Sequence, residues 1–109
     1  MELRHLRYFV AVAEEQSFTK ASEKLFIAQP PLSRQIQNLE SELGIQLFER
    51  GSRSLQLTDA GQFFYQHAVT LLAKAEEVKT MTKRIGLIET TIRMGFVGSL
   101  LYGLLSRIV

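Results

Sequence analysis

The 109-residue chain contains no cysteine, and its only histidines are His5 and His67. The lack of cysteine excludes disulfide frameworks, thiolate zinc sites and cysteine nucleophiles. The sequence also has no H-E-x-x-H motif and no glycine-rich phosphate loop, and its carboxylates fall mainly on the outer faces of the expected helices. We therefore expect no catalytic residue, no metal site and no cofactor.

Long apolar runs are also missing. No segment approaches the ~18 residues that a membrane span requires, and the N-terminus from Met1 to His5 lacks the basic-then-apolar order of a signal peptide. These absences predict no membrane partner and a cytoplasmic location. With 46% hydrophobic and 22% charged residues, the chain is expected to fold as one compact domain plus a short extension.

Excess charge of one sign is small, because 13 basic and 11 acidic residues leave a net charge of +2. Residues 1–57 hold seven basic and seven acidic residues, residues 58–77 sum to −2, and residues 78–109 sum to +4. The chain therefore lacks a uniformly basic surface for nucleic acid. Any such role must depend on where a few cations lie.

The spacing of apolar residues predicts a first helix over roughly residues 3–15. Its core side carries Leu6, Phe9, Val10 and Ala13, and its outer side carries Arg4, Tyr8 and Ala11. Ser17 is a good N-cap for a short second helix that ends at Leu25. Residues 26–28 are too few for a paired strand and are expected to form a tight connection.

A third helix is expected over about residues 30–43, because prolines fit its first turn and Gly44 supplies its end. Its apolar stripe consists of Leu32, Ile36, Leu39 and Leu43. The outer face carries Pro30, Arg34, Gln37 and Ser41, with Ser33 and Asn38 on its borders.

Two alternating segments, 45–49 and 54–57, predict a two-stranded ribbon whose turn is flanked by Arg50 and Arg53. Thr58 then caps a long helix, with Asp59 in its first turn. From residue 59 to about 86 this helix would extend about 42 Å, which is more than the first domain needs. A heptad seam along it predicts a second copy as partner: Phe64, Ala68, Leu71, Ala75, Val78, Thr82 and Ile85. A second stripe, formed by Tyr65, Val69 and Leu72, is suited to covering the three-helix unit.

The second and third helices with their tight connection form a helix-turn-helix. Gln29 and Arg34 lie at its polar end, and these residue types make paired hydrogen bonds to adenine and guanine edges. A solvated helix face fits the same spacing about equally well, and the turn lacks the glycine often found in this motif.

Five segments together resemble the DNA-binding region of LysR-type transcriptional regulators. They are residues 6–9 (LRYF), 17–21 (SFTKA), 28–44 (AQPPLSRQIQNLESELG), 47–50 (LFER) and 57–61 (LTDAG). The resemblance covers about residues 1–88 and implies a mainly α fold. It implies a winged helix-turn-helix of three helices and a two-stranded wing in residues 1–58. A dimerising linker helix would occupy residues 59–88.

The resemblance also implies which residues touch DNA. The residues assigned to base edges are Gln29, Pro30, Pro31, Ser33 and Arg34. The residues assigned to the backbone or the wing are Thr19, Lys20, Gln37, Asn38, Arg50 and Arg53. Gln37 and Asn38 stand where many members carry arginine, so we expect weaker attraction to phosphates.

Residues 91–99 read as a buried strand that runs into a helix. They resemble family members that respond to muconate and benzoate in aromatic catabolism. This implies that residues 89–109 are the hinge and first strand–helix piece of a truncated effector-binding domain. In a full-length protein Ser99 would touch the inducer carboxylate, whereas this chain is expected to bind no inducer.

The expected partners are double-stranded DNA, read as an inverted repeat, and a second copy of the chain, with a tetramer allowed for a full-length protein. The alternative is a helical dimerisation protein without specific DNA binding.

Overall fold

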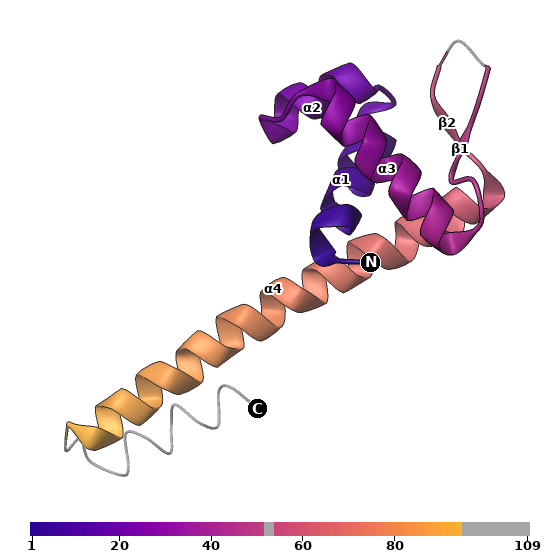
Figure 1. Cartoon of the computed structure of the whole chain (residues 1–109). Helices are drawn as coiled ribbons and strands as arrows, with labels where there is room; N and C mark the ends of the chain where they lie inside the picture. Colours follow the sequence, from indigo (N-terminus) through magenta and orange to yellow (C-terminus); the bar gives the residue numbers. More distant parts are fainter. Residues whose placement is uncertain (52–53, 95–109) are drawn as a thin grey trace. The chain divides into compact units, whose positions relative to one another are not determined.

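The computed structural model describes residues 1–51 and 54–94 (Figure 1). The elements follow the order α1 (Leu3–Glu15), α2 (Phe18–Leu25), α3 (Gln29–Leu43), β1 (Phe48–Glu49), β2 (Gln56–Leu57) and α4 (Asp59–Arg93). The two strands are antiparallel, with Phe48 opposite Leu57 and Glu49 opposite Gln56. The chain divides into two units, Met1–Leu72 and Ala73–Val109. Among the described residues, no helix is both long enough and apolar enough to cross a bilayer.

Local capping chemistry sets the helix boundaries. The Ser17 Oγ accepts a hydrogen bond from the Lys20 amide at 3.1 Å, which caps α2. Gly44 ends α3 in the left-handed region at φ 71°, where glycine has no Cβ to strain. The Thr58 Oγ1 accepts a hydrogen bond from the Gly61 amide at 3.0 Å at the start of α4. These contacts confirm the predicted start of α2, the predicted end of α3 and the predicted start of α4.

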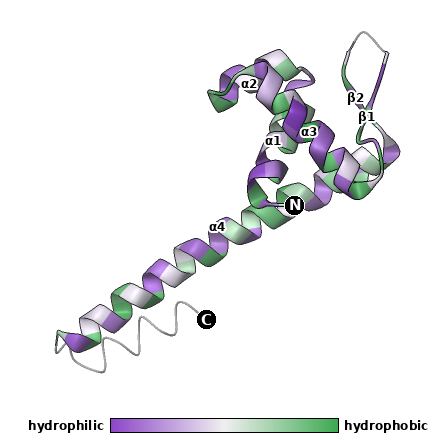
Figure 2. Ribbon diagram, in the orientation of Figure 1, coloured by the Kyte–Doolittle hydropathy of each residue, from purple (hydrophilic) through white to green (hydrophobic). Residues whose placement is uncertain are grey.

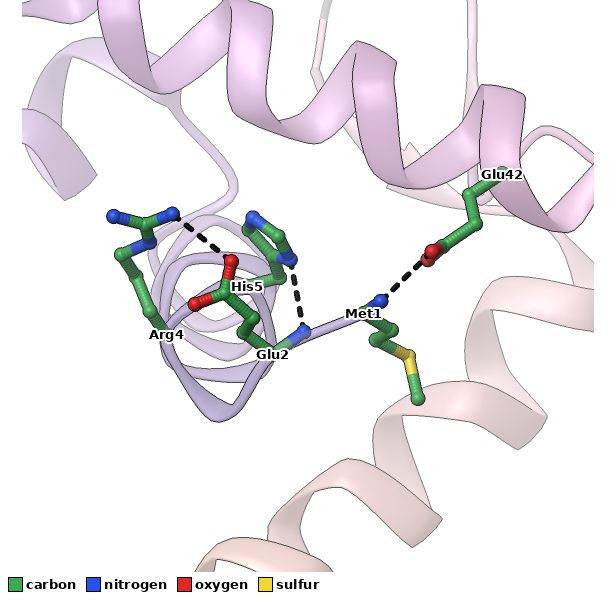
Figure 3. Close-up of polar contacts among 5 residues, drawn as sticks. All are labelled: Met1, Glu2, Arg4, His5 and Glu42. Carbon is green, nitrogen blue, oxygen red and sulfur yellow. Dashed lines mark hydrogen bonds and ion pairs between the residues drawn. The ribbon is translucent and has the colours of Figure 1, made fainter.

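Polar contacts in the first turn of α1 also fix its position (Figure 3). The Glu2 amide donates to His5 Nδ1 at 3.0 Å, so His5 contributes to the cap of this helix. The Met1 ammonium pairs with Glu42 Oε1 at 2.7 Å, which ties the start of α1 to the last turn of α3.

The core of the first unit is centred on Phe9, which is fully buried. Its ring centroid lies 5.4 Å from that of Phe48 in β1 and 5.0 Å from that of Phe64 in α4, the second pair edge to face. One side chain of α1 therefore contacts both the wing and α4. The buried cluster consists of Leu6, Phe9, Ala11, Val12, Ala21, Leu32, Ile36, Leu39, Leu47, Phe48 and Ala68.

Two predictions about side-chain burial were wrong. Ala11 is buried and Tyr8 packs against the core, because α1 contacts α4 in addition to α2 and α3 and so has little outer face. Leu43, the last member of the predicted apolar stripe of α3, is 39% exposed because the helix ends there.

The end of the long helix was also predicted wrongly. α4 continues past the expected end near residue 86 to Arg93, so residues 91–93 are helical rather than extended. The hydroxyls of Thr90 and Thr91 donate to the carbonyls of Gly86 and Leu87, which accommodates these β-branched residues in the helix. Residues 95–99, the rest of the predicted strand, lie outside the described residues.

The base of the wing, meaning residues 46–51, lies against the start of α4. The Thr58 amide donates to the Leu47 carbonyl at 3.0 Å, and the Thr58 hydroxyl donates to the Gln46 carbonyl at 2.8 Å. A Cβ built on Gly61 would overlap the Leu47 carbonyl oxygen, so only glycine allows this approach.

Gly61→Ala is therefore expected to lower the free energy of unfolding by about 3 kcal/mol, because the backbone of the wing must move to admit a methyl group. Gly86→Ala is the control, since a Cβ at that helical position meets open space. It should raise stability by about 0.5–1 kcal/mol. Urea unfolding followed by circular dichroism measures both, and a Gly61→Ala protein as stable as the wild type would contradict the packing.

Candidate nucleic-acid interface

The turn between α2 and α3 is built on Phe26. This residue caps α2 in the left-handed region at φ 58° and ψ 40°, and its amide donates to the carbonyls of Glu23 and Ser22. Its side chain is 94% exposed. The structure confirms the tight connection, and the place usually held by glycine is occupied by an exposed aromatic residue.

The outer face of α3 is polar and uncovered, as predicted. Arg34, Gln37 and Asn38 are exposed, while Gln29 and Ser33 are half-buried. Within residues 1–51 and 54–94, none of these five side chains has a hydrogen-bond or ion-pair partner. Purple segments along α3 in Figure 2 mark its hydrophilic residues. These side chains are free to bind a ligand.

The first turn of α3 offers few backbone donors. Pro30 and Pro31 lack an N–H group, Ala28 provides no side-chain cap, and the Leu32 amide already donates to the Ala28 carbonyl at 3.4 Å. Any ligand at this end of α3 would therefore have to be bound mainly by side chains.

The start of α2 and the base of the wing face one another across an open cleft of about 520 Å³. Its lining includes Ser17, Phe18 and Lys20 from α2 together with Arg50 and Gly51 from the wing. The structure thus places Lys20 and Arg50, two residues predicted to contact the DNA backbone, at the same cleft. Thr19 is exposed in the same first turn of α2.

Sequence reasoning missed Glu40, a buried acid on α3. Its Oε2 accepts hydrogen bonds from the Leu47 and Phe48 amides at 2.7 and 3.3 Å. Its Oε1 pairs with Arg50 Nη2 at 2.5 Å. Glu40 lies four residues after Ile36, on the core side of α3, and a carboxylate in that position signals a buried acid that needs donors. Arg50, which the resemblance assigns to the DNA backbone or the wing, therefore already pairs with Glu40 through one of its nitrogens.

A tyrosine joins α4 to α1 in the same unit. The Tyr65 hydroxyl donates to Glu14 Oε2 at 2.7 Å. This hydrogen bond, partial burial and the negative charge of Glu14 raise the pKa of Tyr65 above its ordinary value of 10.0. The phenol stays protonated and keeps this contact throughout the neutral range.

Two residues of the predicted dimer seam pack within the first unit instead. Phe64 packs against Phe9, and Ala68 is buried in the core of the same unit, so neither is free for a partner chain. Of the later seam positions, Leu71, Val78 and Ile85 are 49%, 52% and 44% exposed, Thr82 is exposed and Ala75 is half-buried. Of the second stripe, Tyr65 and Leu72 cover the core, whereas Val69 is 40% exposed. Arg53 and Ser99 lie outside the described residues.

Residues 3–62 match the family described as "Bacterial regulatory helix-turn-helix protein, lysR family". The chain belongs to the lysR family. The match covers α1 through the start of α4, which are the elements that form the polar face and the cleft, and it confirms the resemblance found in the sequence.

Two relatives and one solved structure of this family are especially similar. The HTH-type transcriptional regulator BenM of Acinetobacter baylyi is 71% identical over 109 residues, which are 100% of this chain and 36% of BenM. The probable cat1 operon transcriptional activator of Acinetobacter lwoffii is 51% identical over 110 aligned residues, 100% of this chain and 36% of the relative. The chain thus spans little more than a third of these relatives. A crystal structure described as the BenM_DBD/benA site 1 DNA complex has a TM-score of 0.78 and 71% identity, covering 79% of this chain and 97% of that one.

In this lysR-family chain, Phe26→Gly is expected to raise the free energy of unfolding by about 0.5–1 kcal/mol, because glycine adopts the left-handed region without strain and the exposed ring gives up no packing. Gly44→Ala is the matched control, since its φ of +71° lies in the same region and a Cβ there meets open space. It should lower stability by a similar amount. Thermal unfolding measures both. A Phe26→Gly protein that is less stable than the wild type would contradict the prediction and show that the Phe26 ring stabilises the fold by packing.

Proposed function

We propose that this chain is the DNA-binding part of a transcriptional regulator, that it acts by binding rather than catalysis, and that it works in the cytoplasm, where bacterial DNA lies. The observation that carries the proposal is the row of unpaired polar side chains on α3, held outward by the packing of α2 and α1. The similarity to the BenM_DBD complex with benA site 1 DNA supports it.

On this proposal α3 enters the major groove with its N-terminal half. Arg34 donates two hydrogen bonds to a guanine edge, and Gln29 pairs with an adenine. Ser33 and the rings of Pro30 and Pro31 complete the contact with the bases. Side chains must supply this recognition because the two prolines remove backbone donors.

Backbone phosphates are held around this contact. Lys20 and Arg50 face the cleft beside the start of α2, where the first-turn amides of Phe18 and Thr19 have no acceptor within the helix and add partial positive charge. The further backbone contacts in the proposal are Thr19, Gln37, Asn38 and Arg53.

Two copies are proposed to pair along α4, because apolar side chains at heptad spacing remain exposed there. A twofold dimer presents two α3 helices and reads an inverted repeat. The proposed division is a DNA-binding domain in residues 1–58, a dimerising helix in 59–88 and the opening of an effector-binding domain in 89–109. In a longer protein, Ser99 would contact an inducer.

Arg34→Ala is expected to weaken binding to the duplex selected from a random-sequence pool by about 1–3 kcal/mol and to relax preference at one base pair. Arg4→Ala is the charge-matched control, because Arg4 pairs with Glu2 in the first turn of α1, beside the C-terminal end of α3. Fluorescence anisotropy against the selected duplex and its single-base variants measures both effects. Unchanged affinity and preference in Arg34→Ala would favour the dimerisation protein without specific DNA binding.

Val78→Lys is expected to raise the dimer dissociation constant at least about tenfold, because it places a charge in an apolar seam. Leu87→Lys is the control. Leu87 is 68% exposed on the same helix, nine residues on and therefore on the opposite side. Sedimentation equilibrium measures the constant, and equal effects of the two changes would place the dimer contact elsewhere.

A further inference from the structure

The two oxygens of the Glu40 carboxylate bind different partners. Oε2 accepts from the amides of Leu47 and Phe48, which fixes the backbone where the wing begins. Oε1 is left for Arg50. The Glu40 side chain is 9% exposed, whereas that of Arg50 is 42% exposed. The buried carboxylate of Glu40 therefore binds one edge of the Arg50 guanidinium, whose side chain also reaches solvent.

Arg50 keeps further hydrogen-bonding capacity when it is held in this way. A guanidinium carries five N–H donors in a planar fork, and the contact with Glu40 uses only Nη2. The side chain lines the cleft opposite Ser17 and Lys20. An anion in that cleft can thus meet a guanidinium that is already held at one of its nitrogens.

We infer that Glu40 is a positioning residue for DNA binding. Its buried carboxylate orients Arg50 so that the guanidinium can bind a phosphate of the DNA backbone in the cleft between α2 and the wing. The inference rests on the proposed function. Preorganisation is the physical reason, since an arginine held in place loses less side-chain freedom when it binds a phosphate.

The inference predicts an effect opposite to that of simple electrostatics. Removing a negative charge close to DNA should tighten binding if charge alone matters. Glu49→Gln is the control for that effect, because Glu49 lines the same cleft, is exposed, and has no side-chain partner within residues 1–51 and 54–94. Glu40→Gln removes the same charge and also releases Arg50.

The test measures affinity for the fluorescein-labelled selected duplex as a function of salt, with each variant shown to be folded at the assay temperature. Glu49→Gln should bind as tightly as the wild type or more tightly. Glu40→Gln should bind at least about threefold more weakly, and the slope of log K against log salt should become shallower by about one for each phosphate that is no longer neutralised. Glu40→Gln binding that equals or exceeds that of the wild type would overturn the inference.

A double-mutant cycle separates positioning from a general loss of structure. Arg50→Ala should weaken binding, and adding Glu40→Gln to it should change the affinity no further, because Glu40 acts through Arg50. A further loss of affinity in the double variant would show that Glu40 acts by another route and would overturn the inference.

Arg50→Lys provides a test that leaves the buried carboxylate in place. An ammonium has no planar fork, so this variant should also bind more weakly although its charge is unchanged. Affinity equal to that of the wild type would overturn the inference. The proposed function is tested by separate outcomes. It would be contradicted if the wild-type chain selects no DNA sequence from the random pool, or if Arg34→Ala keeps the full sequence preference.

Discussion

The geometry of the first unit depends on one buried carboxylate, that of Glu40. Among the described residues, the wing contains two residue pairs of antiparallel ladder, which are too few to hold a ribbon in place. Glu40 supplies an acceptor for two wing amides from a position on α3 itself. The wing is therefore fixed to α3 rather than held by its own sheet alone. A buried carboxylate without hydrogen-bond donors would lower the stability of the fold. The structure is therefore most stable when Glu40 and its donors stay bonded.

A second set of contacts holds the other side of the wing. Thr58 bonds to the carbonyls of Gln46 and Leu47, and Gly61 lets the first turn of α4 lie against the Leu47 carbonyl. The amides of Leu47 and Phe48 are thus bonded to α3, and the carbonyls of Gln46 and Leu47 are bonded to Thr58, which caps α4. Because α3 and the start of α4 also contribute to the core around Phe9, the wing is attached to both helices within the first unit.

Much of this fold could be predicted because its boundaries are set by local chemistry. Ser17, the two prolines, Gly44 and Thr58 act within a few residues of their own positions, and each marks a helix end that the structure confirms. Contacts between distant segments could not be read in the same way. The burial of Ala11, and the use of Phe64 and Ala68 in the core rather than the seam, follow from where α4 lies against α1. Heptad spacing alone does not distinguish side chains of α4 that pack in the core from side chains that are left for a partner chain.

Contacts between distant segments also decide which cations of the candidate interface are available. They therefore change how the interface is expected to bind DNA. Arg50 counts as a cation in the sequence, yet in the structure its charge is balanced by Glu40. On α2 and α3 the cations without an ion partner are Lys20 and Arg34, since Lys24 pairs with Glu14 and Glu15. With Gln37 and Asn38 neutral, few charges remain to attract phosphates without regard to sequence. On the proposed function, the match between hydrogen-bonding side chains and base edges then contributes a larger share of the binding free energy, which favours discrimination between sites over affinity for DNA in general.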